Sequence, residues 1–288
     1  MPQKARDIKR RIDSVESTRQ ITHTMEMVAA SKMRRAEERV RTARPYSEKL
    51  GEVITGLLTP ELAERYPILR QPERIGRAAL ILVTSNRGLC GAFNANLIRL
   101  ARGTMGEMEG RGVSVELHVI GKKGIGFFRF RGRPMASTRQ DIGDRPTMDD
   151  ARSVVDPLIP RFESGELDAI DVVYARFKSA LTTPPTQMRV LPIQPAESGG
   201  AGWRLDYIFE PSAERILTVV LPLYVRHAIY RALVETAAGE QGARRTAMKN
   251  ATDNADELTQ TLTRDYNRAR QSQITQEIAE IVGGAAAV

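Results

Sequence analysis

The two ends of the chain carry long stretches whose apolar residues recur three and four positions apart, and this pattern constrains the fold most. From about Gln3 to Leu57 there is one proline, Pro45, and glycine occurs only late, at Gly51 and Gly56. The apolar positions of this stretch include Ile8, Ile12, Val15, Met25, Val28, Ala36, Val40, Ala43, Leu50, Ile54 and Leu57. This spacing predicts a single helix, and at ~1.5 Å per residue about 50 residues would extend roughly 75 Å. Such a helix needs a partner to pack against, and Pro45 is expected to bend it near residues 42–44.

A second long helix is predicted from about Pro222 to Val282, where two consecutive glycines are expected to end it. Its apolar stripe comprises Leu258, Leu262, Tyr266, Ala269, Ile274, Ile278 and Ile281. Gly239 and Gly242 form a weak point, because each costs ~1 kcal/mol relative to alanine inside a helix. Long helices with narrow apolar stripes at opposite ends of one chain are the expected halves of an antiparallel coiled coil.

Between these helices, short apolar runs alternate with helical stretches, as in a parallel α/β sheet. The predicted strands are Ala78–Thr84, Ser114–Ile120 and Ile170–Phe177, the predicted helices are Asn94–Met108 and Met148–Phe162, and a glycine-rich turn is expected at Gly121–Gly126. Two further runs, Gln187–Pro192 and Leu205–Phe209, are expected as added strands, with an antiparallel edge as one option, and Ala196–Gly202 as a loop. The predicted fold is therefore α/β, with a long antiparallel coiled coil of N- and C-terminal helices (residues 1–57 and 212–288) plus a central Rossmann-like βαβ domain (residues 75–210).

Composition argues against several kinds of site. Cys90 is the only cysteine, so no intrachain disulfide is expected, and the three histidines show no metal-ligand spacing. No apolar run approaches the ~18 to 20 residues of a membrane-spanning helix. The basic N-terminus lacks the apolar core of a secretory signal, and its acidic residues are unlike those of a transit peptide. We therefore expect a chain that stays in the cytosol, crosses no membrane and has no metal site.

The formal net charge of +8 is concentrated near the N-terminus, where residues 1–50 hold 13 Lys and Arg against 7 Asp and Glu. This excess indicates an acidic partner, whether nucleic acid, anionic lipid or an acidic protein surface. Much of the excess lies in a basic cluster of Lys32, Arg34, Arg35, Arg39, Arg41 and Arg44. Nucleic acid is disfavoured, because this cluster lacks interleaved aromatic residues and is interrupted by Glu37 and Glu38. A contact with an acidic protein is preferred over nucleic acid, and a solvated helix face remains an equal alternative to that contact.

Two glycine-containing segments invite catalytic or phosphate-binding interpretations. Gly121–Gly126 follows a strand, but it matches neither the dinucleotide fingerprint nor the P-loop spacing. The segment Ser85–Gly91 lacks the GxSxG order of a nucleophile elbow and has no nearby histidine in the sequence. Simple strand-to-helix connections are favoured for both segments, and no catalytic or cofactor-binding residue is predicted.

Motifs of specific sequence occur near both ends of the chain and in its centre. Residues 21–34 read ITHTMEMVAASKMR and residues 43–46 continue with ARPY. Residues 246–255 read TAMKNATDNA, residues 270–285 read RQSQITQEIAEIVGGA, and the central segment 85–94 reads SNRGLCGAFN. The terminal motifs resemble the signatures of the gamma subunit of F-type ATP synthases, and the central segment resembles that family's central loop. Together the motifs cover the chain from end to end.

The resemblance implies a central rotor shaft that couples proton translocation to ATP synthesis without a catalytic site or cofactor of its own. It implies α and β subunits around the coiled coil, with the central domain on the c-ring and the epsilon subunit, at the cytoplasmic face of the plasma membrane. By motif, Met25, Lys32, Arg34 and Arg35 would face an acidic lever of the β subunits. Arg244, Gln271 and Thr275 would form a polar catch, and Ile278, Ile281 and Val282 would sit in an apolar bearing.

The chain departs from the family pattern at residues 239–245, GEQGARR, where a SEHAARM-like stretch is common. Its two glycines and additional arginine raise the question of local helix stiffness. Two rival functions remain: an enzyme built on the central domain, and a nucleic-acid-binding coiled-coil protein. Neither rival accounts for the terminal motifs.

Overall fold

The computed structural model describes residues 2–57, 65–193 and 213–285. The elements in chain order are α1 (Pro2–Leu57), η1 (Pro67–Leu69), β1 (Arg77–Val83), α3 (Phe93–Gly110), β2 (Ser114–Ile120), α4 (Lys122–Phe130), β3 (Ser137–Arg139), α5 (Met148–Val155), α6 (Ile159–Glu163), β4 (Ala169–Ala175), β5 (Pro185–Leu191) and α7 (Ala213–Ala285). The chain forms two compact units. The paired-helix unit contains Met1–Ala30 and Arg244–Val288, and the α/β unit contains Ser31–Ala243. The predicted three-segment division stays a prediction.

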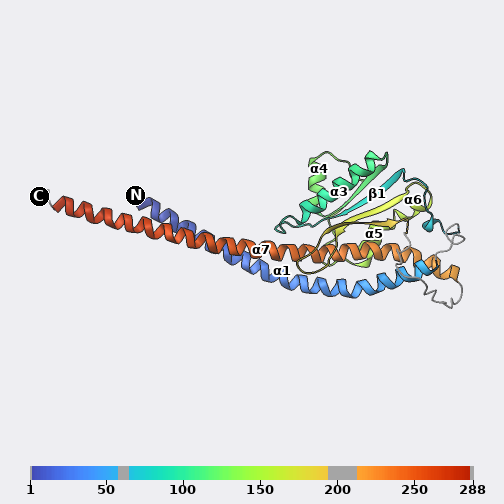
Figure 1. Cartoon of the computed structure of the whole chain (residues 1–288), viewed down its shortest axis with the longest axis horizontal. Helices are drawn as coiled ribbons and strands as arrows, with labels where there is room; N and C mark the ends of the chain where they lie inside the picture. The colour runs from blue at the N-terminus through green and yellow to red at the C-terminus, as the bar shows by residue number, and fades with distance from the viewer. Residues whose placement is uncertain (1, 58–64, 194–212, 286–288) are drawn as a thin grey trace. The chain divides into compact units, whose positions relative to one another are not determined.

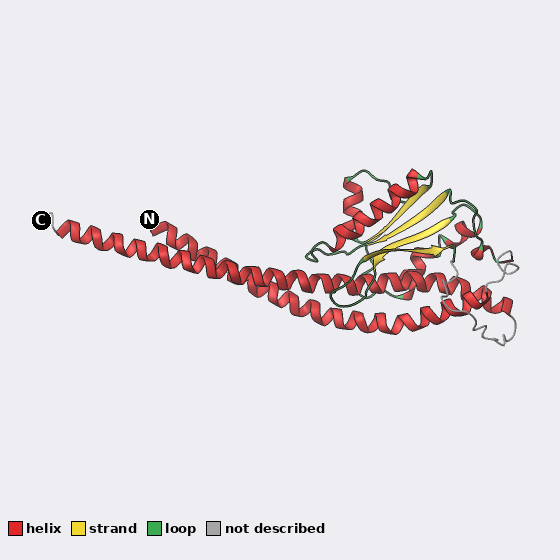
Figure 2. Cartoon of the chain, in the orientation of Figure 1, coloured by secondary structure: helices red, strands yellow, loops and turns green. Residues whose placement is uncertain are grey.

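The α/β unit is built on a five-stranded sheet in the order β3-β2-β1-β4-β5. Strands β3, β2, β1 and β4 run parallel, and β5 pairs antiparallel with β4 at one edge. Helices α3 and α4 lie over one face of this sheet, while α5, α6 and the first part of α7 lie on the other (Figure 1). Figure 2 shows the sheet between these helical layers. The unit is therefore a three-layer α/β fold.

After Arg77, strand β1 is apolar and buried, because both of its faces are covered. Ala79, Ile81 and Val83 pack into the core with α5, α6 and α7, whereas Leu80 and Leu82 pack with α3 and α4. Successive side chains of a strand point to opposite faces, so a strand covered on both sides reads as a continuous apolar run. This explains why the run in the sequence shows no alternation.

Within the α/β unit, α1 and α7 run antiparallel at close range. A Cβ atom placed on Gly242 would lie 3.6 Å from Sδ of Met33, and one on Gly51 would lie 3.6 Å from Cε2 of Tyr224. Moving 18 residues forward along α1 thus moves the contact 18 residues back along α7. Small buried residues of both helices fill the seam between these points: Ala36, Val40, Val234 and Ala238.

The paired-helix unit shows the same direction. Thr252 donates a hydrogen bond to Thr22 at 2.8 Å, and Arg19 forms an ion pair with Asp256 at 3.4 Å. Buried residues along this seam are Thr22, Ala29, Met248, Thr252, Ala255 and Leu262. On α7, the steps from 248 to 252, 255 and 262 follow heptad spacing. The predicted antiparallel pairing of the terminal helices is confirmed.

Several predicted boundaries were wrong, each for a physical reason. Helix α7 begins at Ala213 and passes through Pro222, because buried neighbours such as Leu221 and Val225 hold the helix against the core across the proline. It also continues past the paired glycines to Ala285. The glycine-rich turn is helix α4 in the structure. The single helix predicted for 148–162 is divided into α5 and α6, since Pro157 lacks a backbone donor and disfavours a helical residue before it.

Other element predictions stand closer to the structure. Strand β2 has the predicted bounds, and β1 and α3 differ from theirs by one or two residues. Strand β5 is the predicted antiparallel edge strand, and β4 ends at Ala175, two residues before its predicted end. The three-residue strand β3 was not predicted. Helix α1 continues through Pro45, where the expected bend stays a prediction. The predicted strand Leu205–Phe209 and loop Ala196–Gly202 lie outside the described residues.

By length and composition, α7 contains one window apolar enough to cross a membrane, a test that core helices of soluble proteins also pass. Leu217, Leu221, Val225 and Ile229 of this helix are buried within the α/β unit. Packing against the sheet therefore accounts for the apolar character of this part of α7.

Candidate functional site

The carboxyl ends of β1 and β4 form the place where an open α/β sheet usually binds a ligand. From β1 the chain proceeds to β2 on one side, and it later returns to place β4 on the other. This reversal is a topological switch point, and ligands of such folds bind in the crevice outside the strand ends there. In this chain the crevice is the first place to look for chemistry.

Helix α7 occupies that position with two consecutive polar residues. The hydroxyl oxygen of Thr236 accepts a hydrogen bond from the N–H of Ala175 at 3.2 Å. The carboxylate of Glu235 accepts one from the N–H of Phe177 at 2.9 Å. Both acceptors are buried. The backbone just beyond β4 is thus hydrogen-bonded to α7, and we call these four residues the sheet–helix joint.

A charge pair reinforces the sheet–helix joint. Nε of Arg231, one turn earlier on α7, lies 3.0 Å from the Glu235 carboxylate, whose side chain is only 1% exposed. Burial, followed by the charge of Glu235, raises the pKa of Tyr174 on β4. A buried carboxylate without partners would be costly, so the N–H of Phe177 ties Glu235 to the backbone beyond β4, while Arg231 balances its charge from within α7.

Two glycines bring α7 close to the β4–β5 connection. A Cβ on Gly239 would lie 3.2 to 3.3 Å from Thr183, Ala175 and Phe93, and one on Gly242 would lie 3.0 Å from the carbonyl oxygen of Ala180. Both glycines are buried. The segment that the sequence marked as a weak point is therefore a close-packing surface, where larger side chains would not fit.

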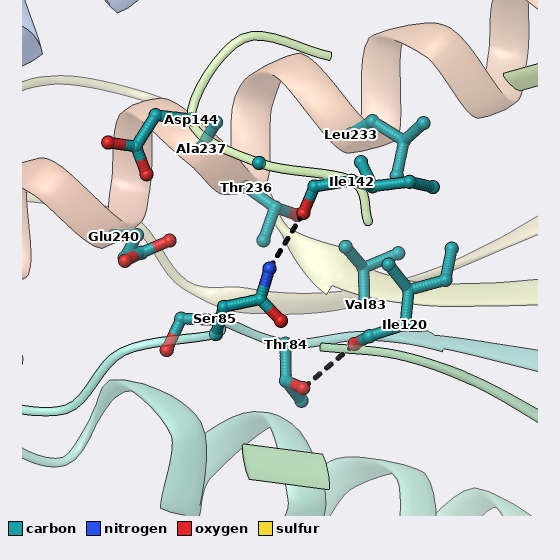
Figure 3. Close-up of a pocket in the computed structure, with 12 residues that line it drawn as sticks. Val83, Thr84, Ser85, Ile120, Ile142, Asp144, Leu233, Thr236, Ala237 and Glu240 are labelled. Carbon is teal, nitrogen blue, oxygen red and sulfur yellow. Dashed lines mark hydrogen bonds between the residues drawn. The ribbon is translucent and has the colours of Figure 1, made fainter. Parts of the chain in front are cut away.

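The cavity at this crevice is too small for a nucleotide (Figure 3). Its volume is about 30 Å³, and its lining comes from the ends of β1 and β2, from residues 142–144 and from α7. Thr84 donates to the carbonyl of Ile120 at 2.8 Å, and Asn86 donates to that of Ile142 at 2.9 Å, so the polar groups beside it are largely used within the fold. A space of this size holds about one water molecule.

The N-terminus of α4 does not offer free donors to a phosphate. The N–H of Lys122 donates to the side chain of Asn86 at 3.0 Å, that of Lys123 to the carbonyl of Ser85 at 3.1 Å, and that of Gly124 to the hydroxyl of Thr84 at 3.0 Å. Gly121 has φ +100°, and a Cβ there would collide with the Thr84 carbonyl oxygen at 2.2 Å. The glycines thus serve the close approach of α4 to β1.

The Ser85–Gly91 segment is likewise a structural connection. The Ser85 hydroxyl donates to the carbonyl of Arg87 and accepts a hydrogen bond from the amide of Asn94 at 2.8 Å. That amide also contacts Sγ of the buried Cys90 at 3.2 Å. These bonds fold the loop onto the start of α3, with no acid–base partner for the serine among them. Within residues 2–57, 65–193 and 213–285, no group of three His, Cys, Asp or Glu side chains could hold a metal ion.

Within the α/β unit, α1 is also linked to the loop before α5. Nζ of Lys32 lies 2.7 Å from the carboxylate of Asp144, and Arg39 donates to the Asp144 carbonyl at 3.4 Å. Lys32, expected to face another subunit, is therefore engaged within the chain, whereas Arg34 and Arg35 are exposed. Neither Asp144 nor the sheet–helix joint was predicted. A glutamate inside the apolar run Ala232–Ala238 was the available signal for the joint.

The other predicted contact residues lie in the paired-helix unit. Met25 is half-buried and Arg244 is buried. Gln271 and Thr275 are exposed, and the Thr275 hydroxyl donates to the Gln271 carbonyl at 3.0 Å within the helix. Four apolar residues near the end of α7 are also exposed, and we call them the C-terminal apolar stripe: Ile274, Ile278, Ile281 and Val282.

The comparisons with known proteins decide the family. A family model described as ATP synthase matches residues 4–288. An ATP synthase gamma chain of Gemmatimonas aurantiaca is 57% identical over 286 residues, covering 99% of both chains. The chain belongs to the ATP synthase gamma chain family. The ATP synthase gamma chain of Pelotomaculum thermopropionicum is 43% identical over 98% of both chains, which supports the same family.

Solved structures support the gamma-chain fold. A chain of the Euglena gracilis mitochondrial ATP synthase, solved with its F1 and c-ring, has a TM-score of 0.69 at 19% identity, covering 100% of this chain and 95% of that one. A chain from the central stalk and c-ring of the Tetrahymena thermophila enzyme has a TM-score of 0.59 at 23% identity, covering 80% and 99%. The resemblance inferred from the motifs is confirmed, and the chain is a non-catalytic stalk subunit of a membrane-associated complex.

Proposed function

We propose that this gamma-family chain is the central rotor shaft that couples proton translocation to ATP synthesis or hydrolysis in partner subunits. The observation that carries the proposal is helix α7. It is one continuous helix from Ala213 to Ala285, it is hydrogen-bonded to the sheet at the joint, and it pairs with α1 in the paired-helix unit. A load applied to the α/β unit would thus reach the coiled coil through unbroken backbone.

The sheet–helix joint suits the transmission of torque. Two hydrogen bonds, from the N–H groups of Ala175 and Phe177 to α7, resist sliding of α7 along the end of β4, and Gly239 and Gly242 keep the contact close. The ion pair between Arg231 and Glu235 lies within α7 and holds the glutamate side chain in place. Bonds of this kind are directional, and partner groups left unpaired by sliding would be costly in the buried setting. The ligand crevice of the fold would therefore act as a mechanical fixing point.

The surface of the paired-helix unit suits a shaft that turns within a ring. The C-terminal apolar stripe is exposed, with Ile278 at 56%, Ile281 at 73% and Val282 at 62%. Apolar contacts are non-directional, so a bearing around this stripe would hold the shaft without fixing one angle. Gln271 and Thr275 lie one turn apart, and with Arg244 they are proposed to make polar contacts that hold particular angles.

The partners are proposed to be the α and β subunits around the coiled coil, the epsilon subunit and the c-ring. An asymmetric shaft presents different faces to the surrounding subunits and so favours a different conformation in each. Exposed Arg34 and Arg35 suit an acidic surface of the β subunits, and Met25 would pack beside it. Lys32 would act indirectly, by holding α1 to Asp144. The complex would place the chain peripherally, at the cytoplasmic face of the plasma membrane.

Co-expression with α and β subunits from the same source tests this function. A purified assembly with one copy of this chain, and with ATPase activity above that of α and β alone, is expected. An ordered α and β hexamer that excludes the chain would refute the proposal. Tight nucleotide binding by the isolated chain would favour the rival function, an enzyme built on the central domain. The cavity of about 30 Å³ at the crevice is, however, too small to hold a nucleotide.

A further inference from the structure

The outer surface of α3 and α4 in the α/β unit carries positive charge that the joint and the coiled coil do not use. Residues 117–140 contain six Lys and Arg and no Asp or Glu. Arg129 and Arg131 are exposed at the end of α4, and Arg102 is exposed on α3. Among the residues that the structure describes, neither Arg102 nor Arg129 has an ion-pair partner. Of the six, Arg133 and Arg139 are ion-paired with Glu109 and Asp141. The exposed charge that remains on α3 and α4 favours an anionic partner.

Beside these arginines lies a hollow of about 220 Å³ between α3 and α4. Buried Met105 and Phe128 and half-buried Phe127 give it an apolar floor, and its arginines are Arg102, Arg131 and Arg133. The guanidinium of Arg131 lies 5.9 Å from the centre of the Phe127 ring. An apolar floor with an arginine rim is the composition found at the centre of many protein interfaces.

The one carboxylate at the hollow is already engaged. Glu109 is ion-paired with Arg133, which leaves the other rim arginines as the groups available to a ligand. Gly106 lines the hollow from α3, and a Cβ placed on it would meet nothing within 4 Å. The hollow is thus open to the outside and is not filled by the chain itself.

Phe130, the last residue of α4, is an exposed apolar side chain next in the sequence to Arg131, which lines the hollow. It is 89% exposed, more than any other large apolar residue among the described ones. It follows Arg129 and precedes Arg131 in the sequence. Aromatic side chains and arginines are the residues most often found as interface hot spots.

We propose that the hollow between α3 and α4 binds an acidic segment of another protein subunit, which inserts a large apolar side chain between carboxylates held by the rim arginines. Planar guanidinium groups bind carboxylates through two hydrogen bonds, which suits Arg102 and Arg131 to this role. Phe130 covers the outside of the inserted segment. The proposal rests on the assembly of the chain into an ATP synthase.

The burial of the apolar residues of α4 argues against a lipid membrane as the partner of this surface. A helix that lies on a membrane needs its apolar face free to enter the bilayer. The apolar residues Ile125 and Phe128 of α4 are instead buried in the core with α3. Nucleic acid is also disfavoured, because the apolar concavity offers its backbone few contacts, and base stacking would need more exposed rings than Phe130 provides.

Site-specific photo-crosslinking in the assembled complex tests the proposal. Phe130→p-benzoylphenylalanine is expected to crosslink to a subunit segment that contains more Asp and Glu than Lys and Arg. The matched control is Leu181→p-benzoylphenylalanine, at a residue that is 85% exposed in the β4–β5 connection; it should not give that product. Gly106→Leu, whose new Cβ would meet nothing within 4 Å, places an apolar side chain in the hollow and should lower the yield of the product at least about fivefold. The double variant R102E/R131E should lower it further.

A crosslink only to lipid or to nucleic acid would overturn the proposal, as would a protein product whose yield is unchanged in both variants. A purified assembly with raised ATPase activity but no such product would refute this inference alone. If no assembly forms, a labelled peptide with six Glu and two Phe residues is titrated against the full chain. Binding that R102E/R131E weakens at least about tenfold, and R152E on α5 leaves unchanged, supports the proposal; equal loss in both variants overturns it.

Discussion

The glutamate of the sheet–helix joint offers the sharpest test of how the chain is held together. Glu235→Ala removes an acceptor with a side chain that is 1% exposed. The N–H of Phe177 then loses the acceptor that Glu235 supplies, and such a loss costs about 1–3 kcal/mol for a buried donor. Arg231 loses a pair that would cost ~3–5 kcal/mol if fully buried. Because Arg231 is 23% exposed and also hydrogen-bonds to Tyr174, its share falls well below that range.

The expected loss is therefore about 3 kcal/mol in the free energy of unfolding, measured by urea denaturation of the full chain. The control is Glu257→Ala, an exposed glutamate on the same helix, which should change stability by less than about 0.5 kcal/mol. Glu235→Gln keeps an oxygen for the Phe177 N–H and should lose less than alanine. If Glu235→Ala and Glu257→Ala unfold at the same urea concentration, the joint does not stabilise the fold.

Two further perturbations test packing and titration. Gly239→Leu should cost at least about 1–3 kcal/mol of stability, because neighbouring atoms lie 3.2–3.3 Å from the new Cβ. The control Gly103→Leu, whose Cβ would meet nothing within 4 Å, should be neutral or stabilising. Equal effects of the two variants in urea denaturation would contradict the close contact at Gly239. Burial lowers the pKa of His118, whose Nδ1 lies 2.7 Å from the Ser137 hydroxyl, against a smaller opposing effect of Glu116. The neutral imidazole is favoured in the fold, so stability should be complete above the unfolded pKa near 6.5 and should fall as the pH drops below it. His118→Gln should reduce the stability difference between about pH 7.5 and about pH 5.5, and an unchanged difference would refute the assignment.

The sequence predicted best where one kind of interaction dominates. The repeated spacing of apolar residues was enough to predict the two long helices. Strand β1 is covered on both faces, and a continuous apolar run that includes Leu80–Val83 was enough to predict it. Helix boundaries failed where tertiary packing overrides a local preference, as at Pro222 inside α7. Gly121 and Gly124 were predicted to form a turn. The structural reason for glycine at both positions is the close approach of Thr84, which lies far away in the sequence.

The functional residues were harder to foresee for the same reason. The signatures indicated Lys32 as a contact to another subunit, but its nearest acidic partner is Asp144, 112 positions further along the chain. Glu235 stood out only as a charge in an apolar stretch, and nothing local identified the Phe177 N–H as its partner. Exposure of Ile278 and Ile281 agrees with their assignment to an outer contact, although their partner stays a prediction.

The equal spacing of contacts along the two long helices limits how the chain can change in length. Met33 lies against Gly242 and Gly51 against Tyr224, so the spacing along α1 equals that along α7 between these points. Inserting one codon between positions 33 and 51 would rotate every later residue of α1 by about 100°, away from its place in the seam. Viable insertions or deletions in this stretch should therefore occur in whole heptads or in matched pairs, one in each helix, while the turns on the surface of the α/β unit can vary singly.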